Sequence, residues 1–186
     1  MATLDVHNMA LYRLGCEPIS AVAEDSARAL ALVAFSENIR KRLFQEYLWP
    51  FAIKSAALDE NGDTPIFNWD YAYDLPADYL GPVSEENDET IHIESGVLYS
   101  NVAELGLKYI WDNDDPDLYS ELFNNVWALE LAWAASYKLC QDKTLKDQLK
   151  DDLKDAKYKA AALHARELAP EEYKINTFTL SRRGVI

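Results

Sequence analysis

The dipeptide Trp49-Pro50 restricts the fold of this chain more than any other local feature. Before it, apolar residues recur with the spacing of a helix, whereas from Phe51 to Leu58 the pattern becomes that of a strand. The α conformation is disfavoured for a residue that precedes proline, so we expect a helix to end at Trp49. The chain therefore passes from a helical part to a β part here. We predict that Trp49, Pro50 and Phe51 anchor this corner, with both aromatic rings in apolar surroundings.

Amphipathic helices are predicted on both sides of the β part, from helical spacing combined with end signals. The predicted helices cover residues 3–14, 26–48, 115–140 and 144–169. Asp25 or Ser26 is the expected cap of the second helix. The third should start at Asp115-Pro116, because aspartate caps helices and proline fits the first helical position. Thr144 is the expected cap of the fourth.

The same spacing predicts which side chains these helices bury. In the second helix the apolar face consists of Ala27, Leu30, Ala31, Val33, Ala34, Ile39, Leu43, Phe44 and Tyr47. In the third helix one stripe contains Leu118, Leu122, Val126, Leu129, Trp133 and Tyr137. In the fourth helix a narrow seam of Leu145, Leu149 and Leu153 lies among charges of both signs.

Residues 50–111 read as strands separated by polar turns. The predicted strands are 51–58, 67–75, the two arms of a hairpin within 90–100 that turns at residues 94–96, and 105–111. Aromatic residues alternate with polar or small ones at Phe67, Trp69, Tyr71 and Tyr73. Such a face fits either a core or an oligomer interface, because interfaces are also enriched in Tyr and Trp.

The order of these elements predicts an α+β fold, in which an antiparallel bundle of about four helices carries a β insertion between its second and third helices. The predicted helical domain is discontinuous and combines residues 1–49 with 112–170. The insertion covers 50–111, and residues 171–186 form an extended C-terminal tail without a helix or strand pattern. A length of 186 residues suits such a single domain with a sizeable insertion.

Charge is distributed unevenly along the chain, whose formal net charge is −14. Residues 59–90 contain ten acidic side chains and no Lys or Arg. Those expected to surround a channel or rim are Asp59, Glu60, Asp63, Glu85, Glu86, Asp88 and Glu89. The tail 173–186 is basic instead, and its candidate docking residues are Lys174, Phe178, Leu180, Arg182 and Arg183. The simpler alternative is that the acidic loops are only solvated and the tail only frayed.

Motifs for catalysis or for binding of metals and cofactors are absent from the sequence. It has neither a glycine-rich phosphate loop nor a G-x-S-x-G nucleophile elbow. The three histidines lie on different predicted elements, and DENGD at 59–63 lacks the register and the distal glutamate of a calcium loop. We therefore expect no enzyme, no metal and no cofactor. We also do not expect this acidic chain to bind the phosphate backbone of a nucleic acid, because such binding requires Lys and Arg.

The cysteines and the N-terminal sequence suit a protein made in a reducing cytosol. Cys16 and Cys140 fit neither the spacing of a zinc site nor a disulfide framework, and we interpret them as buried or incidental thiols. Residues 1–15 lack the basic and apolar regions of a secretory signal. No apolar run reaches the length of about 18 residues that indicates a membrane span.

Four segments together resemble the tail tubular protein A, or head-to-tail adaptor, family of short-tailed bacteriophages. They are ALYRLGCEPISAVAEDSARAL (10–30), LWPFAIKSAAL (48–58), YDLPADYLGP (73–82) and LKYIWDNDDPDLYSELFNNVWALELAWAAS (107–136). The resemblance rests on their order and spacing. The chain departs from the family at Pro50, where other members commonly have a polar residue, and at Gly81, where a basic residue is frequent.

The resemblance implies a structural protein of the virion, without an active site. Copies of the chain would form a ring, usually of twelve, between the portal protein and the tail nozzle protein or the tail fibres. Assembly would take place in the cytoplasm of the bacterial host, and genomic DNA would pass through the ring during ejection without specific binding. An acidic wall suits such a channel, because it repels phosphates within about 10 Å at ordinary salt.

A closed ring also needs complementary contacts between neighbouring copies, for which the mixed charges of residues 144–158 are candidates. We expect the basic tail to become ordered only on docking to the portal. The alternative functions are another neck or head-completion protein of the virion, or an acidic DNA mimic that occupies basic sites on a nucleic-acid-binding protein.

Overall fold

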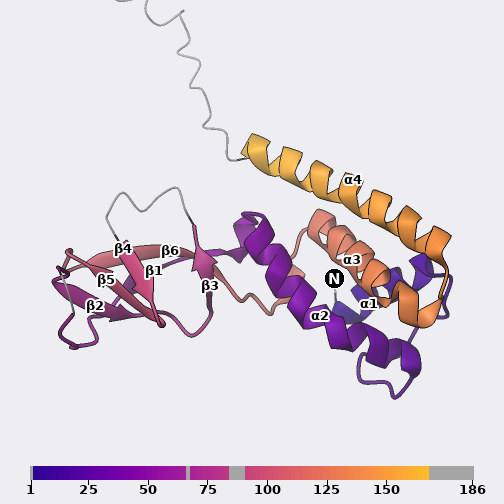
Figure 1. Ribbon diagram of the computed structural model, residues 1–186, viewed down its shortest axis with the longest axis horizontal. Helices are drawn as coiled ribbons and strands as arrows, with labels where there is room; N and C mark the ends of the chain where they lie inside the picture. Colours follow the sequence, from indigo (N-terminus) through magenta and orange to yellow (C-terminus); the bar gives the residue numbers. More distant parts are fainter. Residues whose placement is uncertain (1, 66–67, 84–90, 168–186) are drawn as a thin grey trace, which may run out of the picture.

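The computed structural model describes residues 2–65, 68–83 and 91–167. Within these residues the chain forms four α-helices and two small sheets, with the sheets at one end of the molecule and the helices at the other (Figure 1). The helices are α1 (Thr3–Arg13), α2 (Ala27–Glu46), α3 (Glu121–Leu139) and α4 (Lys143–Glu167). Every strand in the described residues lies between α2 and α3, which confirms the predicted α+β fold with a β insertion.

The end of α2 shows how the chain turns from helix to strand. The Ser26 side chain caps the start of this helix, as predicted, and accepts a hydrogen bond from the Ala29 amide at 3.3 Å. The helix ends at Glu46, two residues before the predicted end, and Trp49 is extended, as expected before a proline. Residues Pro50–Ala52 form a single 3-10 turn, η1, so the first strand begins at Ile53, two residues later than predicted, and ends at Leu58 as predicted.

The predicted start of the third helix at Asp115 is wrong. Asp115 does cap a turn, by accepting a hydrogen bond from the Asp117 amide at 3.0 Å. That turn, η2 (Pro116–Leu118), is a short 3-10 helix, and α3 begins only at Glu121 after a new cap at Ser120. The Ser120 hydroxyl accepts from the Phe123 amide at 3.2 Å. The Asp-Pro signal therefore marks a single 3-10 turn that does not continue into α3.

The predicted cap of the fourth helix is also wrong, by two residues. The carboxylate of Asp142 accepts hydrogen bonds from the amides of Thr144 and Leu145 at 2.8 and 3.2 Å. The positive end of the helix dipole also stabilises a carboxylate at this position. The buried seam of α4 is as expected at Leu149 and Leu153, which are both buried against the other helices.

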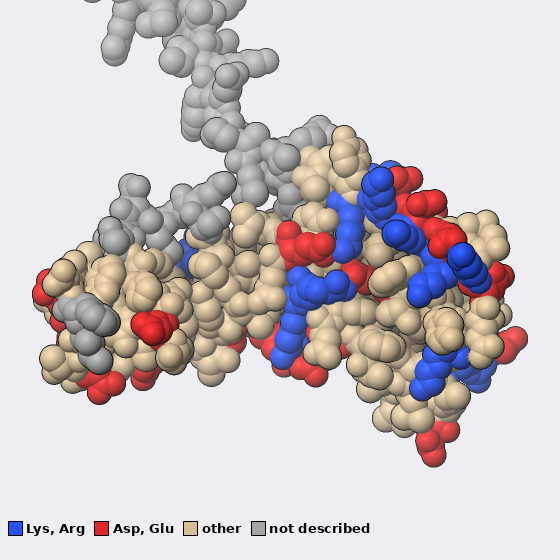
Figure 2. Space-filling model, in the orientation of Figure 1, with Lys and Arg blue, Asp and Glu red and all other residues tan. Residues whose placement is uncertain are grey.

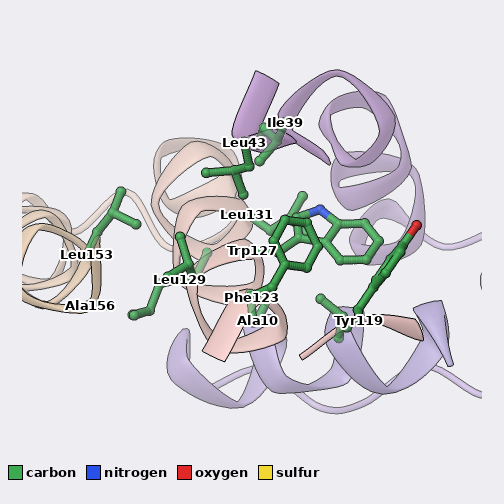
Figure 3. Packing of buried hydrophobic residues seen from close by; sticks show 14 of the residues in the cluster. Ala10, Ile39, Leu43, Tyr119, Phe123, Trp127, Leu129, Leu131, Leu153 and Ala156 are labelled. Atoms are coloured by element: carbon green, nitrogen blue, oxygen red, sulfur yellow. The ribbon is translucent and has the colours of Figure 1, made fainter. Parts of the chain in front are cut away.

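The buried faces of α2 and α3 differ from those predicted. Leu30, Val33, Leu118 and Tyr137 are exposed. The buried side of α2 instead consists of Ala29, Ala31, Leu32, Ser36, Ile39, Arg40, Leu43 and Phe44. In α3 it is centred on Phe123, Trp127 and Leu131 (Figure 3). The prediction is confirmed for Ala31, Ile39, Leu43 and Phe44 of α2 and for Val126 and Leu129 of α3, which are buried. It is wrong at the exposed positions because it followed apolar residues only, whereas the buried side of α2 includes polar side chains that find partners across the core.

The strands form two antiparallel three-stranded sheets within the described part of the insertion. One has the order β1 (Ile53–Leu58), β6 (Leu105–Trp111) and β3 (Tyr79–Pro82). The other has the order β2 (Tyr71–Asp74), β5 (Val97–Ser100) and β4 (Ile91–Glu94). The predicted hairpin is confirmed, with Ser95 and Gly96 in the left-handed conformation of its turn. Strand β3 was not predicted, and β2 is shorter than the predicted strand 67–75, in which Phe67 lies outside the described residues.

A separate hydrophobic cluster joins the two sheets. Its buried members are Tyr73 and Leu98 from one sheet and Leu105, Leu107 and Tyr109 from the other. Since Tyr73 is completely buried, this member of the predicted aromatic face belongs to the core. Trp69 is half-buried at the surface, where its ring stacks on His92 with centroids 6.1 Å apart. Strand β6 also contributes Ile110 to the helical core, so this strand links the helical core to the cluster between the sheets.

Candidate functional site

The predicted corner at Trp49 is the point where the helices and the sheets meet. The Trp49 indole is 2 % exposed and donates a hydrogen bond from Nε1 to the Leu43 carbonyl oxygen at 2.9 Å. Its ring stacks on Phe51 and meets the edge of Phe123, with centroids at 5.8 and 5.1 Å. Pro50 is exposed and starts η1. Of the three predicted anchor residues, the two aromatic ones therefore enter the core and the proline forms the bend.

The aromatic rings around this corner come from elements far apart in the sequence. Phe44 from α2, Phe51 from η1, Tyr119 before α3 and Phe123 in α3 are mutual neighbours, with ring centroids 5.1 to 5.8 Å apart. Trp127 extends the group by one turn of α3 (Figure 3). Edge-to-face pairs at such distances add to the stability gained from burial. The corner is thus part of the helical core itself.

A backbone clasp closes the base of the insertion. The Phe51 carbonyl oxygen accepts hydrogen bonds from Trp111 Nε1 at 3.2 Å and from Asn113 Nδ2 at 3.1 Å. Phe51 lies where the chain enters the insertion, and Trp111 and Asn113 lie where it leaves. Next to the clasp along both segments of the chain, Ile53 and Ile110 are paired across β1 and β6. The two ends of the insertion are therefore held side by side.

Arg40 ties this clasp to α2. Its guanidinium donates to Asp112 Oδ1 at 2.7 Å, to the Asn113 carbonyl oxygen and to the Tyr119 hydroxyl at 3.3 Å. Lys41 pairs with the second oxygen of Asp112 at 2.9 Å. Burial alone would raise the pKa of Asp112, but the bonds and charges of Lys41 and Arg40 outweigh it and lower that pKa. The carboxylate is therefore ionised and held between the helical part and the insertion.

A buried carboxylate also joins α2, α3 and α4. The Glu130 side chain is 4 % exposed and pairs with Arg42 of α2 and with Lys157 of α4. Lys157 also pairs with Glu46 at 2.7 Å. Both Arg40 and Glu130 were missed by sequence reasoning. No local pattern marks either residue as buried, because the partners that compensate their charges lie on other elements.

The predicted acidic residues that the structure describes are at the sheet end of the molecule. Asp59, Glu60 and Asp63 follow β1 and are exposed. Asp70 and Asp74 are exposed nearby, and acidic side chains are visible over this end in Figure 2. The other predicted members, Glu85, Glu86, Asp88 and Glu89, lie outside the described residues.

Basic side chains are concentrated on the helical part instead. In Figure 2 they alternate with acidic ones over α4. A shallow groove of about 430 Å³ runs between α4 and the end of α2 and is lined by Tyr47, Lys150, Leu153, Lys154, Lys157, Tyr158 and Ala161. Within the described part of the chain, Lys150 and Lys154 have no ion-pair partner. The candidate docking residues Lys174, Phe178, Leu180, Arg182 and Arg183 lie outside the described residues.

A smaller cavity of about 220 Å³ lies between α1, α2 and η2. Its walls include His7, whose Nε2 is 2.8 Å from the Ser36 hydroxyl, together with Arg40 and Tyr119. Burial lowers the pKa of His7, so this imidazole is neutral at pH 7. Arg40 is already bound to Asp112 and the Asn113 carbonyl. The cavity thus combines these polar side chains with apolar ones such as Val22 and Val33, and the carboxylate of Asp114 also lines it.

Metal ligands and membrane-spanning helices were sought in the same residues. Among the residues with described positions, no three His, Cys, Asp or Glu side chains gather closely enough to hold a metal ion. None of the helices placed by the structure combines the length and apolar character needed to cross a bilayer.

Known proteins supply no further evidence on the site. Neither a scan against protein-family models nor a search of the curated proteins finds a match to this chain.

Proposed function

We propose that this chain is the subunit of a head-to-tail adaptor ring in a short-tailed bacteriophage. The single observation that carries the proposal is the clasped two-part subunit. A helical part and a β insertion meet at Phe51, Trp111 and Asn113, and this junction lies within the segments that resemble the adaptor family. The ring would connect the portal to the tail nozzle protein or the tail fibres. Its role is structural and requires no active site.

The charge distribution supports a ring through which DNA passes. Exposed carboxylates at Asp59, Glu60 and Asp63 lie on the insertion, at the opposite end from the lysines of α4. A channel wall that carries carboxylates repels the phosphates of passing DNA, so the DNA slides without being held. The insertion is therefore the part of the subunit that we place toward the channel or its rim.

The exposed face of α4 supports contacts between copies. A ring of identical subunits is closed by heterologous contacts, in which two different surfaces of the same chain meet. The groove beside Lys150 and Lys154 offers a basic surface with apolar patches, and the acidic side chains that alternate with the lysines along α4 offer the opposite charge. The copy number is proposed as twelve, to match the expected portal ring.

The decisive experiment mixes the purified full chain with the portal protein encoded beside it and examines the mixture by electron microscopy. We expect a ring of this chain below the portal. A ring at another place in the virion neck would support the alternative of a different neck or head-completion protein. Binding to basic nucleic-acid-binding proteins by a monomer, with no ring on the portal, would favour the DNA-mimic alternative and contradict the adaptor.

The basic tail provides a second arm of this experiment. Deletion of residues 173–186 should abolish portal binding while the far-UV circular dichroism of the helices is retained. A matched variant, with Lys174, Arg182 and Arg183 changed to alanine, separates the charge of the tail from its length. Undiminished portal binding by the deletion variant would overturn the tail as the docking element, although the ring could still form through the described part of the chain.

A further inference from the structure

The thiols of Cys16 and Cys140 meet in the folded chain, although the whole of α2, both sheets and α3 separate them in the sequence. Cys140 Sγ donates a hydrogen bond to the Leu14 carbonyl oxygen at 3.4 Å, and Cys16 Sγ is 3.9 Å from the same oxygen. Cys16 follows the end of α1, and Cys140 is the residue that closes α3. Both sulfur atoms therefore lie against one carbonyl oxygen where these two helices end.

The backbone holds both cysteines in fixed turns. The Cys16 amide donates to the Leu11 carbonyl oxygen at 3.0 Å, in a turn that requires the left-handed conformation of Gly15. The Cys140 amide donates to the Ser136 carbonyl oxygen at 2.9 Å. Both side chains are half-buried at the edge of the helical core. They are thus positioned toward each other and are still accessible to a small reagent.

The environment of Cys140 distinguishes this pair from a reactive catalytic thiol. Burial raises the pKa of Cys140, and the neighbouring Cys16 thiol raises it further. Catalytic and redox-sensing cysteines generally have the opposite property, a pKa that is lowered by nearby positive charge. Peroxide oxidation and thiol–disulfide exchange both proceed through the thiolate, so the raised pKa makes either reaction slow at neutral pH. The closeness of the two sulfur atoms to one carbonyl oxygen is what favours a bridge between them once one thiol has reacted.

We propose that Cys16 and Cys140 are a modification site at which a low-molecular-weight disulfide, such as glutathione disulfide, forms an intramolecular bridge. The thiolate of one cysteine attacks glutathione disulfide and releases one glutathione, leaving a mixed disulfide. The thiolate of the second cysteine attacks the protein sulfur of this mixed disulfide and releases the second glutathione. The cysteine pair thereby loses two electrons and two protons, and glutathione disulfide is reduced to two molecules of glutathione.

The bridge would fasten the N-terminal helix to the end of α3. It closes a loop that contains most of the chain, and cross-links across long loops restrict the unfolded state most strongly. A reducing cytosol keeps such thiols reduced, whereas surroundings outside the cell favour the disulfide. The bridge itself does not depend on the proposed function. Its consequence, a virion part that becomes more stable after release from the host, does rest on that proposal.

The test uses the reduced full-length chain, freed of reductant and equilibrated with glutathione disulfide at mildly alkaline pH without denaturant. We expect an intact mass lower by two hydrogen atoms and a peptide map in which Cys16 and Cys140 are linked. The melting temperature should rise by about 5–10 °C and return to its original value when the bridge is reduced. The variants Cys16→Ser and Cys140→Ser should fold, show no such rise and serve as matched controls.

Several results would overturn the proposal. Glutathione adducts that persist on both cysteines, covalent dimers, or thiols that stay unmodified in excess glutathione disulfide would each show that the pair does not close in the native state. An intramolecular bridge without a higher melting temperature would contradict the stabilising role. Circular dichroism of the serine variants before oxidation ensures that a missing bridge is not caused by misfolding.

Discussion

The indole nitrogen of Trp49 donates a hydrogen bond to the carbonyl oxygen of Leu43, six residues earlier, at 2.9 Å. This bond folds the chain back over the end of α2, where carbonyl groups lack helical partners. It also places the indole ring against Phe51 and Phe123. The residue that ends the helix by preceding a proline therefore also fills the core beneath that end.

Replacement of Trp49 by alanine should lower the free energy of unfolding by about 3–5 kcal/mol, because the ring is almost completely buried. Trp49→Phe keeps an aromatic ring but loses the donor to Leu43, and should cost about 1–2 kcal/mol. Urea denaturation followed by circular dichroism measures both. The control Tyr12→Ala changes an aromatic residue that is 85 % exposed and should stay within about 0.5 kcal/mol of the wild type.

A contrary result at Trp49 would also be informative. If Trp49→Ala kept the stability of the wild type and failed only in ring formation on the portal, the corner would be an interface between copies. The buried position of the indole and its bond to Leu43 predict the reverse order, in which stability is lost first.

Asp112 should make folding stability sensitive to acid. Its pKa in the folded chain is below the ordinary value of 3.8, because Lys41 and Arg40 outweigh the opposing effect of burial. The ionised carboxylate therefore contributes stability that is fully present above pH 3.8 and is lost as the pH falls through the lower folded value. Asp112→Asn should cost about 2–3 kcal/mol at pH 7, because Arg40 and Lys41 lose a charged partner.

Denaturation of wild type and Asp112→Asn at pH 7 and at about pH 3 checks this expectation. The difference in stability between the two proteins should shrink at the lower pH, where the wild-type carboxylate begins to be protonated. Glu104→Gln is a suitable control, since Glu104 is an exposed carboxylate of the insertion that lies away from Arg40 and Lys41 in the sequence. An Asp112→Asn cost that is equal at both pH values would show that lost packing, and not charge, is responsible.

The clasp predicts that the insertion can be removed from the helical part. Ile53 and Ile110 are partners across β1 and β6, so a two-residue Asn-Gly turn can replace residues 54–109. The shortened chain should retain its helical circular dichroism and unfold cooperatively. A loss of about 1–3 kcal/mol is expected, because Val83 is buried in the helical core and leaves with the insertion.

A variant of the full chain tests whether the helical part stays folded when the insertion is destabilised. Tyr73→Ala empties the centre of the cluster between the sheets, in which Tyr73 is completely buried. The unfolding of the helices should then stay close to that of the wild type. Loss of helical structure in the shortened chain, or in Tyr73→Ala, would mean that helices and sheets form one cooperative unit.

Local rules predicted most of the elements correctly. Ser26 caps α2, Trp49-Pro50 ends its helical region, and Ser95-Gly96 forms the hairpin turn, since each depends on the conformations of only a few neighbouring residues. The same rules failed where the signal for a helix start marked only a single turn. Asp115-Pro116 begins a 3-10 turn that ends at Leu118, and two further residues separate it from α3, because the packing of α3 against α2 determines where that helix starts.

The junction required information that is not local. Arg40 is buried because Asp112 and Asn113, more than seventy residues later, supply its partners. A rule that assigns charged residues to the exposed side therefore moved the predicted face of α2 toward Leu30 and Val33, both of which are exposed. The meeting of Cys16 with Cys140 was hidden in the same way, because the packing of α1 on α3 decides it.

The acidic face of the insertion should determine how DNA moves through the ring. The triple variant Asp59→Lys, Glu60→Lys, Asp63→Lys reverses three exposed charges beside β1, so a ring built from it should hold duplex DNA at low salt. The control Glu17→Lys, Asp25→Lys, Glu121→Lys makes the same change of net charge at exposed positions of the helical part.

Retention of labelled duplex DNA by portal-bound rings, measured at about 50 and 200 mM salt, compares the two variants. The insertion variant should retain DNA at the lower salt and release most of it at the higher salt, because added cations compete for the phosphates. The control ring should resemble the wild type at both. Equal retention by both variants would show that only net charge matters and would remove the insertion from the channel wall. The position of three carboxylates, and not their number, is thus what the proposed channel requires.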